Sequence, residues 1–507
     1  MTPLVYLLYS MHTLMIQQVP AGTPLQVRLT NTVGSFSSTV GNPISAVLIA
    51  PVELDGREIL PPGVTFSGKI KSVTRVGYGV RHETASLRLE FNHLILPNGR
   101  TVPIASRVVQ VDNGREKVTS SGLIQGIRST GSISYRVSGY VRTALLWEVH
   151  AEMAEWAIKS LLLELPEPEI YYPAGTELKL GLTMQLTLLA LAEPAESPDE
   201  PDAAGVALSD DAVSDLRSLV ASMPIRTQDP DNHRPSDLTN VLLIGSREEL
   251  ATAFRAAGWS EAGPDSIRAR IRCIRAAAEI HGFRGAPMTA LLLGGAEADM
   301  SWQKSLNDAS KRHHIRVWKQ PGTWNGQELW MAAATRDVDF AYMRPGRWFT
   351  HEIDPRVDEE RDKVAYDLEF TSCARPLVWA ARQGMPHFTR NATGDAIGTD
   401  TRMVVLQLND CASPRLATET EDARTLSARG GKWQRFARRE ILVTRSDFLR
   451  TNIYFRSFEV SRWAYEYVRY RRRKASEMRS LKATYGPAGS SPPATPHTPG
   501  LAIHALR

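Results

Sequence analysis

A turn-and-strand phrase that occurs twice constrains the first third of the chain. Residues 20–30 read PAGTPLQVRLT, and residues 173–183 read PAGTELKLGLT. In each copy a Pro-x-Gly turn leads into a run that alternates between apolar and polar residues, which is the pattern of a half-buried strand. Similar runs lie between further turn signals at 61–63 and 97–99. Turns at such short spacing predict an all-β sandwich or barrel over residues 20–192.

One segment inside this β-domain has a helical period instead. We predict a helical insertion at residues 141–165, packed against the end of the β-domain; a membrane-surface or partner-binding helix is the alternative. Charged residues interrupt this segment, and no other segment offers about 18 or more uncharged apolar residues, so the sequence predicts no transmembrane helix. The apolar residues that recur at helical spacing are Leu145, Val149, Met153, Trp156 and Leu163.

Residues 1–19 form an apolar N-terminal segment. Its apolar run at 4–16 has the length of a signal-peptide core, but no Lys or Arg precedes it, and cleavage after Ala21 would cut into the β-domain. The sequence as written therefore contains no convincing signal peptide. The two interpretations are a start that lies elsewhere and an N-terminal strand packed on the β-domain.

A segment rich in Pro, Glu and Asp at 193–208 is a solvated linker, because this composition cannot bury a core. Residues 209–415 follow with interspersed helices and strands and no repeated β-α-β unit, which predicts an α+β or mixed α/β domain. A basic, partly helical extension at 416–482 and a disordered tail at 483–507, rich in Pro, Ser and Thr, complete a multidomain chain.

Charge and cysteine usage exclude some classes of protein. The chain has 60 Lys and Arg against 55 Asp and Glu, so it is not a polyelectrolyte binder as a whole. No sequence-specific nucleic-acid motif is present. Cys273, Cys373 and Cys411 lie far apart without a C-x-x-C pair, which argues against a zinc knuckle and a disulfide scaffold.

Five ordered motifs in the second domain carry a family resemblance. They are NVLLIGSREEL, AAGW, RHHIRVW, AATRDV and THEIDPRVDEERD, and they lie within residues 237–411. This region resembles the C-terminal domain of LssY-type proteins. That domain occurs alone or beside phosphatidic-acid-phosphatase-like and DedA-like membrane domains, so the resemblance implies a bacterial envelope or lipid-linked setting and no particular reaction. The turn phrases of the β-domain are also similar to those of envelope and secretion-scaffold proteins.

Histidines and carboxylates in residues 311–362 raise the question of a metal site. His313, His314 and His351 would suit zinc or manganese. In a strand, however, His313 and His314 point to opposite faces, so the two cannot share one ion. Helix capping by Asp354 and the positive helix N-terminus explain the acids from Asp358 onwards. The sequence therefore predicts no metal site and identifies no cofactor.

Arginines in the same segment define a candidate anion site. The guanidinium groups of Arg316, Arg336 and Arg361 suit phosphate or carboxylate. Arg361 falls on the apolar face of a predicted helix and therefore needs an acceptor. We favour an internal ion pair with Asp337 or Asp354, and a bound phosphoryl group is the alternative.

A hydrolase would use His313 or His351 as general base, with Asp337 or Glu360 as orienting group or second acid. No G-x-S-x-G, H-E-x-x-H or Walker A motif accompanies these residues. The catalytic candidates are His313, His314, Arg336, Asp337 and His351.

Two further patterns have a structural and a functional interpretation. The tryptophan-rich segment indicates core packing rather than a ligand cage. The C-terminal arginines and the RYRRRK run predict a solvated basic helix, with anionic lipid headgroups or nucleic acid as alternative partners. The tryptophans are Trp302, Trp318, Trp324, Trp330 and Trp348.

The function predicted from the sequence is that of an exported or envelope-associated binding or assembly component. Its expected partners are envelope proteins or anionic lipid headgroups. A hydrolase acting on a phosphorylated or lipid-linked substrate is the alternative.

Overall fold

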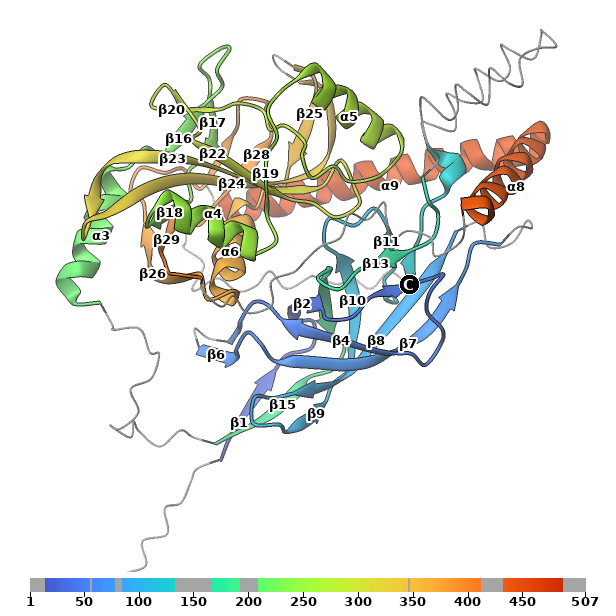
Figure 1. The fold of residues 1–507 in the computed structure, drawn as a ribbon, viewed down its shortest axis with the longest axis horizontal. Helices are drawn as coiled ribbons and strands as arrows, with labels where there is room; N and C mark the ends of the chain where they lie inside the picture. The colour runs from blue at the N-terminus through green and yellow to red at the C-terminus, as the bar shows by residue number, and fades with distance from the viewer. Residues whose placement is uncertain are drawn as a thin grey trace, which may run out of the picture.

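The computed structural model describes residues 14–54, 57–77, 84–132, 166–191, 208–344, 347–411 and 432–486. They form a β-domain (residues 14–191), an α/β region (residues 208–411) and two C-terminal helices (Figure 1). The predicted fold class, an all-β domain followed by a mixed α/β domain, is confirmed. The predicted helix at 141–165 and most of the linker and tail lie outside the described residues.

The β-domain is built from one large antiparallel sheet and short accessory pairs. The large sheet has the strand order β10-β14-β2-β4-β7-β8-β12-β11, with β9 attached to β8. Its strands and accessory strands are β1 (Leu14–Val19), β2 (Pro24–Leu29), β3 (Val33–Gly34), β4 (Pro43–Leu48), β5 (Val52–Leu54), β6 (Arg57–Leu60), β7 (Thr65–Thr74), β8 (Ser86–Ile95), β9 (Thr101–Pro103), β10 (Ser106–Val111), β11 (Lys117–Val118), β12 (Ile124–Gln125), β13 (Tyr171–Tyr172), β14 (Glu177–Leu182) and β15 (Leu186–Leu191).

The sheet curls towards a barrel. The N–H of Ile104, just before β10, donates to the carbonyl of Asn92 in β8, and the Ser106 hydroxyl donates to the carbonyl of Phe91. The alternate apolar side chains of the strands then face one enclosed core, which includes Phe66 and Leu180.

The two copies of the repeated phrase are neighbours in this sheet. Strand β2 pairs antiparallel with β14, with Arg28 opposite Glu177. The turns that precede the strands contain Gly22 and Gly175, both at φ +91°, a conformation that glycine adopts without a steric penalty. Residues 14–19 of the apolar N-terminal segment form β1, which pairs antiparallel with β15 in a separate two-stranded sheet.

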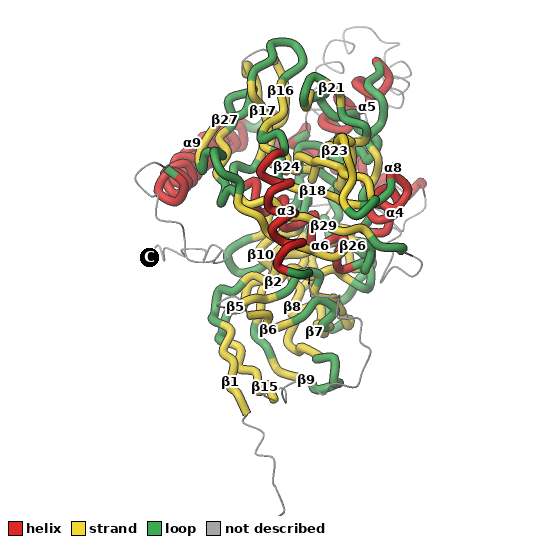
Figure 2. The backbone as a smooth tube through the Cα atoms, turned by 90° about the vertical axis from the view of Figure 1, so that its left-hand side faces the viewer, coloured by secondary structure: helices red, strands yellow, loops and turns green. Residues whose placement is uncertain are grey.

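An eight-stranded mixed sheet forms the middle of three layers in the α/β region (Figure 2). The sheet has the order β19-β22-β23-β24-β18-β29-β26, with β25 attached to β24, and only β18 and β29 are parallel among its pairs. Its strands are β18 (Val241–Ile244), β19 (Ser260–Glu261), β22 (Met300–Lys304), β23 (Arg312–Trp324), β24 (Gln327–Arg344), β25 (Arg347–Ile353), β26 (Ala374–Ala381) and β29 (Arg402–Leu408).

Apolar residues on both faces of this sheet are buried. Helices α4 and α6 pack on one face around Ile315 and Trp330. Helix α3 and the β16-β17-β20-β21 sheet pack on the other face around Trp318 and Met331. The covering elements and the remaining pair are α3 (Asp210–Ser222), α4 (Arg247–Ala256), α5 (Ile267–Ala278), α6 (Val357–Phe370), β16 (Arg226–Gln228), β17 (Pro235–Leu238), β20 (Leu292–Leu293), β21 (Ala296–Glu297), β27 (Phe388–Arg390) and β28 (Ala396–Gly398).

The C-terminal extension forms helices α8 (Lys432–Thr451) and α9 (Ile453–Tyr485). Tyr470 of α9 contacts Asp339 at 3.3 Å, and Lys474 bonds Glu352, so the second half of α9 lies along β24 and β25. None of the helices in the described ranges has the length and apolar character needed to cross a bilayer.

Candidate functional site

The β23–β24 hairpin holds the residues singled out in the sequence and separates them onto two faces. His313 is opposite Arg336, and Arg312 is opposite Asp337. Because side chains alternate along a strand, His313 and Arg336 point towards α6, whereas Asp337 points to the other face. His314 lies on the Asp337 face, as expected, so the histidine doublet does not act as a pair.

On the α6 face, His313 bridges two carboxylates. Its Nδ1 lies 2.6 Å from Glu360 Oε2 on α6, and its Nε2 lies 2.6 Å from Asp112 Oδ2. Arg336 donates to the other oxygen of Asp112 at 2.7 Å. Asp112 directly follows β10, so a side chain of the β-domain lies between two side chains of the α/β region.

Electrostatics favour a charged imidazole at this position. Burial opposes the charged form of His313, but the charges and hydrogen bonds of Asp112 and Glu360 outweigh burial and raise its pKa to about 9. Burial likewise opposes the Asp112 carboxylate, yet His313 and Arg336 hold its pKa below the ordinary range. Burial dominates at Glu360 and raises its pKa, although His313 opposes that shift. At neutral pH the His313–Asp112 contact is therefore an ion pair.

A second ion network joins the same two regions beside the first. Lys363 of α6 contacts Glu177 of β14 at 2.7 Å and Asp367 at 2.6 Å. Lys304 bridges the same two carboxylates at 2.6 and 2.9 Å, and Arg28 adds a bond of 2.8 Å to Glu177. Buried charges are tolerated only when paired, so this network ties the two regions together.

On the opposite face, three side chains converge on Asp337. Its Oδ2 lies 3.2 Å from His351 Nδ1, and 3.4 Å from both His314 Nε2 and Arg312 Nη2. Arg312 also donates to Nε2 of His351 at 3.0 Å, so that nitrogen accepts and the ring is neutral. The His351 side chain is 23% exposed, while Asp337 is 4% exposed, so the group borders solvent at His351.

The charge states on this face are the reverse of those around His313. Burial raises the pKa of Asp337 to about 7, partly opposed by Arg312 and Arg316. Burial and the Arg312 charge lower the pKa of His351 to about 3. Burial and the same arginines hold the pKa of His314 well below its usual range. Asp337 is thus the group of this face that exchanges a proton near neutral pH.

The arginine candidates do not come together. Arg316 donates to the carbonyl of Thr289 at 3.0 Å and lies 3.6 Å from Asp237. Arg336 contacts Asp112 on the opposite face. Each of these guanidinium groups therefore faces a carboxylate of the protein itself.

Arg361 on α6 has the internal acceptors that its buried position requires. Asp400 accepts from both its Nη groups, at 2.6 and 3.1 Å, and Asp362 accepts from Nε at 2.8 Å. Asp358 contacts it at 3.3 Å, and the ring of Trp379 lies 5.0 Å from the guanidinium carbon. The prediction of Asp337 or Asp354 as acceptor was wrong. Asp400, in the loop before β29, lies beside the Arg361 side chain and takes that place.

The start of α6 also corrects a local prediction. The N-cap residue is Arg356, without a side-chain cap. Asp354, the predicted cap, instead accepts from the N–H of Arg356 at 3.0 Å and from its side chain. The predicted acidic first turn is present. Glu360 belongs to this first turn, near the positive end of the helix dipole, and its carboxylate also contacts His313.

With the site described, the chain can be compared with known proteins. Residues 220–403 match the family model of the LssY C-terminus. The chain contains an LssY C-terminal domain. A search of curated proteins finds no match. A solved structure, ComB10 of the Com type IV secretion system of Helicobacter pylori, aligns over 35% of this chain and 93% of its own chain, with 8% identity and a TM-score of 0.20. A likeness at that TM-score says nothing further about this chain.

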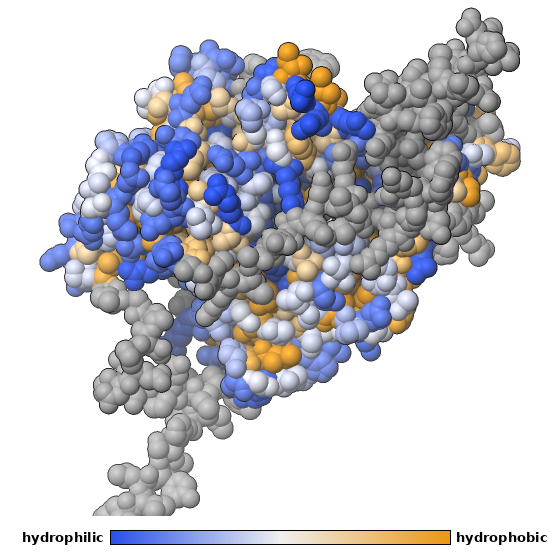
Figure 3. All heavy atoms as spheres, viewed as in Figure 1, coloured by the Kyte–Doolittle hydropathy of each residue, from blue (hydrophilic) through white to orange (hydrophobic). Residues whose placement is uncertain are grey.

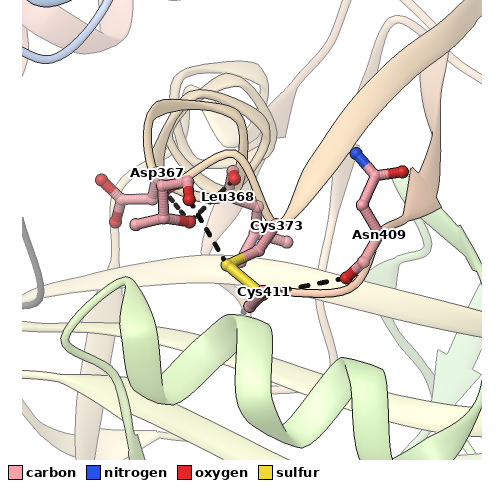
Figure 4. The surroundings of a disulfide bond; sticks show 6 residues. Asp367, Leu368, Cys373, Asn409 and Cys411 are labelled. Atoms are coloured by element: carbon pink, nitrogen blue, oxygen red, sulfur yellow. Dashed lines mark hydrogen bonds between the residues drawn. A yellow bond between two sulfur atoms is a disulfide. The ribbon is translucent and has the colours of Figure 1, made fainter. Parts of the chain in front are cut away.

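A disulfide bond links two segments of the LssY domain, whereas the sequence analysis argued against a disulfide scaffold. Cys373 follows α6, and Cys411 follows β29; their Cα atoms are 4.9 Å apart (Figure 4). The N–H of Asn409 donates to the carbonyl of Cys373 at 2.8 Å and holds the two segments together. The separation of 38 residues gave no local signal for this pair. Cys273 is a free thiol.

Other sequence candidates in the LssY domain have structural roles. Trp302, Trp318 and Trp330 are at most 2% exposed and lie in the core, as predicted; the side chain of Trp348 lies outside the described set. Within the described residues, no cluster of three or more His, Cys, Asp or Glu side chains could hold a metal ion.

Asp112 is the member of the site that sequence reasoning missed. It lies 201 positions before His313, outside the LssY domain, in a β-turn region without a distinctive motif. An acidic residue at the end of a strand is common, so no sequence signal could have identified it.

Proposed function

We propose that this protein is a bacterial cell-envelope component that binds or assembles with other envelope constituents, and that its two domains act as one unit. The observation that carries this proposal is Asp112 of the β-domain, which is partly buried and contacts both His313 and Arg336 of the LssY domain. Side chains that a hydrolase would need free for substrate are used here to join domains.

The disulfide supports a location outside the cytoplasm. Disulfides persist in oxidising compartments and are rare in reducing ones. Cys373 is buried in the core that contains α4 and α6, and Cys411 is partly buried against it, so the bond stabilises the LssY domain where thiols can oxidise.

The C-terminal helices support a partner-binding role. The first half of α9 carries large apolar side chains that project into solvent, together with arginines. A surface of this kind marks an interaction site rather than a soluble monomer face. The most exposed of these side chains are Ile453, Tyr454, Phe458, Val460, Trp463 and Tyr465.

Counting reactive thiols tests the location. Full-length protein expressed in a bacterial host is denatured without reductant and reacted with maleimide-polyethylene glycol. We expect one adduct, at Cys273, and three after reduction. The matched control Cys373→Ser should give two adducts before reduction. Three adducts on unreduced wild-type protein from the native host would overturn the extracytoplasmic location.

A hydrolase is the second candidate, and the group around Asp337 favours it. A carboxyl with a pKa near 7, beside the solvent-bordering His351, can transfer a proton at neutral pH. The pair His351–Asp337 has the base-and-orienter arrangement of such a site, whereas His313 is charged at neutral pH and is not a base. Arg312, which contacts both Asp337 and His351, would then bind the anionic part of a phosphorylated or lipid-linked substrate.

Assays with p-nitrophenyl phosphate and its diester test this second candidate. A hydrolase would show turnover that titrates near pH 7 and that Asp337→Asn abolishes. The exposed residue His233, changed to Asn, is the control and should leave turnover unchanged. Absence of turnover by wild-type protein with both esters would remove this candidate.

A further inference from the structure

Helix α5 exposes a ridge of isoleucines. Ile267, Ile271 and Ile274 are 79%, 59% and 69% exposed, although isoleucine is among the most often buried residues. Their spacing of four and three places them on one side of the helix. Apolar surface is visible above α5 at the upper edge of the molecule in Figure 3.

The opposite side of α5 is the side that packs on the LssY domain. Ala276 is fully buried, and Cys273 is half-buried. Helix α4 shows the usual arrangement, because its larger apolar residues, Leu250 and Phe254, are completely buried. In α5 the order is reversed, with small residues facing the protein and the largest apolar residues facing solvent.

Arginines flank the isoleucine ridge on both sides. At 100° per residue, Arg268, Arg272 and Arg275 lie on one side of the ridge and Arg270 lies on the other. The helix itself, IRARIRCIRAAA, contains no acidic residue. Arg270 pairs with Asp265 and Arg275 with Glu279, both outside the helix. Arg268 and Arg272 extend into solvent.

We propose that α5 lies flat on an anionic lipid surface, with its isoleucines inserted below the headgroups and its arginines on the lipid phosphates. Apolar side chains between flanking arginines match the charge and polarity gradient of such a surface. This inference rests on the proposed envelope function and names one partner and the surface that contacts it.

The size and shape of the ridge favour a lipid surface over a protein partner. Twelve residues make a helix only about 18 Å long. A stable protein interface uses about 20–30 residues on each side, whereas the ridge offers three large apolar side chains. The three isoleucines project outwards from the helix, and the deformable apolar layer of a bilayer can surround them.

The helix is formed before it meets lipid. The Ser266 hydroxyl caps it by accepting from the N–H of Ala269 at 3.1 Å, and the buried alanines hold it on the domain. Binding therefore requires no coupled folding of this segment, which would otherwise weaken it.

Vesicle flotation with the full-length protein tests the proposal. Vesicles of phosphatidylcholine alone are compared with vesicles that contain phosphatidylglycerol, for wild-type protein and the double variant Ile271→Glu/Ile274→Glu. We expect binding to the anionic vesicles only, weakened at least about tenfold by the double variant and by raising salt from about 50 mM to about 500 mM. Slower hydrogen exchange within 267–278 on anionic vesicles would locate the contact.

The control is Val40→Glu, which places one glutamate on a similarly exposed apolar residue of the β-domain. It should bind like wild-type protein. Wild-type protein that fails to bind, or a double variant that binds equally well, overturns the inference and leaves the thiol count as the separate test of envelope location. A concentration-dependent dimer that the double variant abolishes would assign the ridge to a second copy and also overturn it.

Discussion

His313 and His314 are neighbours in β23, yet the structure gives them opposite chemistry. His313 points to α6 and lies between the carboxylates of Asp112 and Glu360, which raise its pKa to about 9. His314 points to the other face, where burial and two arginines keep its imidazole neutral. Both residues are at most 5% exposed, so burial alone does not decide their charge.

The comparison teaches that partner charge, and not burial, separates the two faces of the hairpin. Around His313 on the α6 face, the carboxylates of Asp112 and Glu360 lie beside the cations of His313 and Arg336, and the His313 ion pair joins two domains. On the other face, burial raises the pKa of Asp337 to about 7 although Arg312 and Arg316 oppose the shift. The histidines beside it, His314 and His351, are neutral. One face is suited to holding structure and the other to exchanging a proton.

The largest expected difference between the faces is in stability. His313→Gln removes the cation, leaves the buried Glu360 without its partner and leaves Asp112 with Arg336 alone, so we expect a loss of about 3–5 kcal/mol in the free energy of unfolding. His314→Gln replaces one neutral polar group with another and should lose only about 1 kcal/mol. Urea unfolding of both variants at pH 7 measures the two losses.

Equal losses in the two variants would break the comparison between the faces. The variant His233→Asn, at an exposed histidine, controls for general effects of histidine replacement and should unfold like wild-type protein.

The pH dependence of stability should also follow His313. Its pKa is about 9 in the folded protein and about 6.5 when unfolded, so its contribution is complete below pH 6.5 and is lost as pH rises through 9. We expect wild-type protein to lose about 2–3 kcal/mol across that window. Urea unfolding from pH 6 to pH 9.5 should give a flatter profile for His313→Gln. Parallel profiles would show that His313 is neutral when folded.

Asp337 should show the smallest effect, with the opposite sign. Its pKa is raised to about 7, so its ionisation destabilises the folded state as pH rises from about 4 to about 7. Asp337→Asn removes that ionisation and should raise the free energy of unfolding by about 1–2 kcal/mol at pH 8, because lost acceptor contacts with Arg312 offset part of the gain. Thermal unfolding at pH 5 and pH 8 tests this. Destabilisation at pH 8 would contradict it.

Local features were predictable from the sequence. Alternation along β23 separated His313 from His314, and the predicted acidic first turn of α6 is present. Both depend on residues within a few positions, where backbone geometry fixes which side chains meet. The repeated phrase likewise predicted two strands, and the structure pairs them as neighbours in one sheet.

Long-range partners were not predictable. Asp112, the Cys373–Cys411 bond and the Asp400 acceptor of Arg361 all depend on how separate segments dock. Burial required Arg361 to have an acceptor, but several carboxylates satisfied that demand equally in the sequence. Only tertiary packing selects one of them.

A double-mutant cycle between Asp112→Asn and His313→Gln tests most directly whether His313 joins the two domains. If the two residues form the interdomain ion pair, each single variant removes the same interaction. The loss of stability in the double variant should then be smaller than the sum of the two single losses, by about 2 kcal/mol or more. Losses that add within about 0.5 kcal/mol would show that the residues act independently and would contradict the interdomain link.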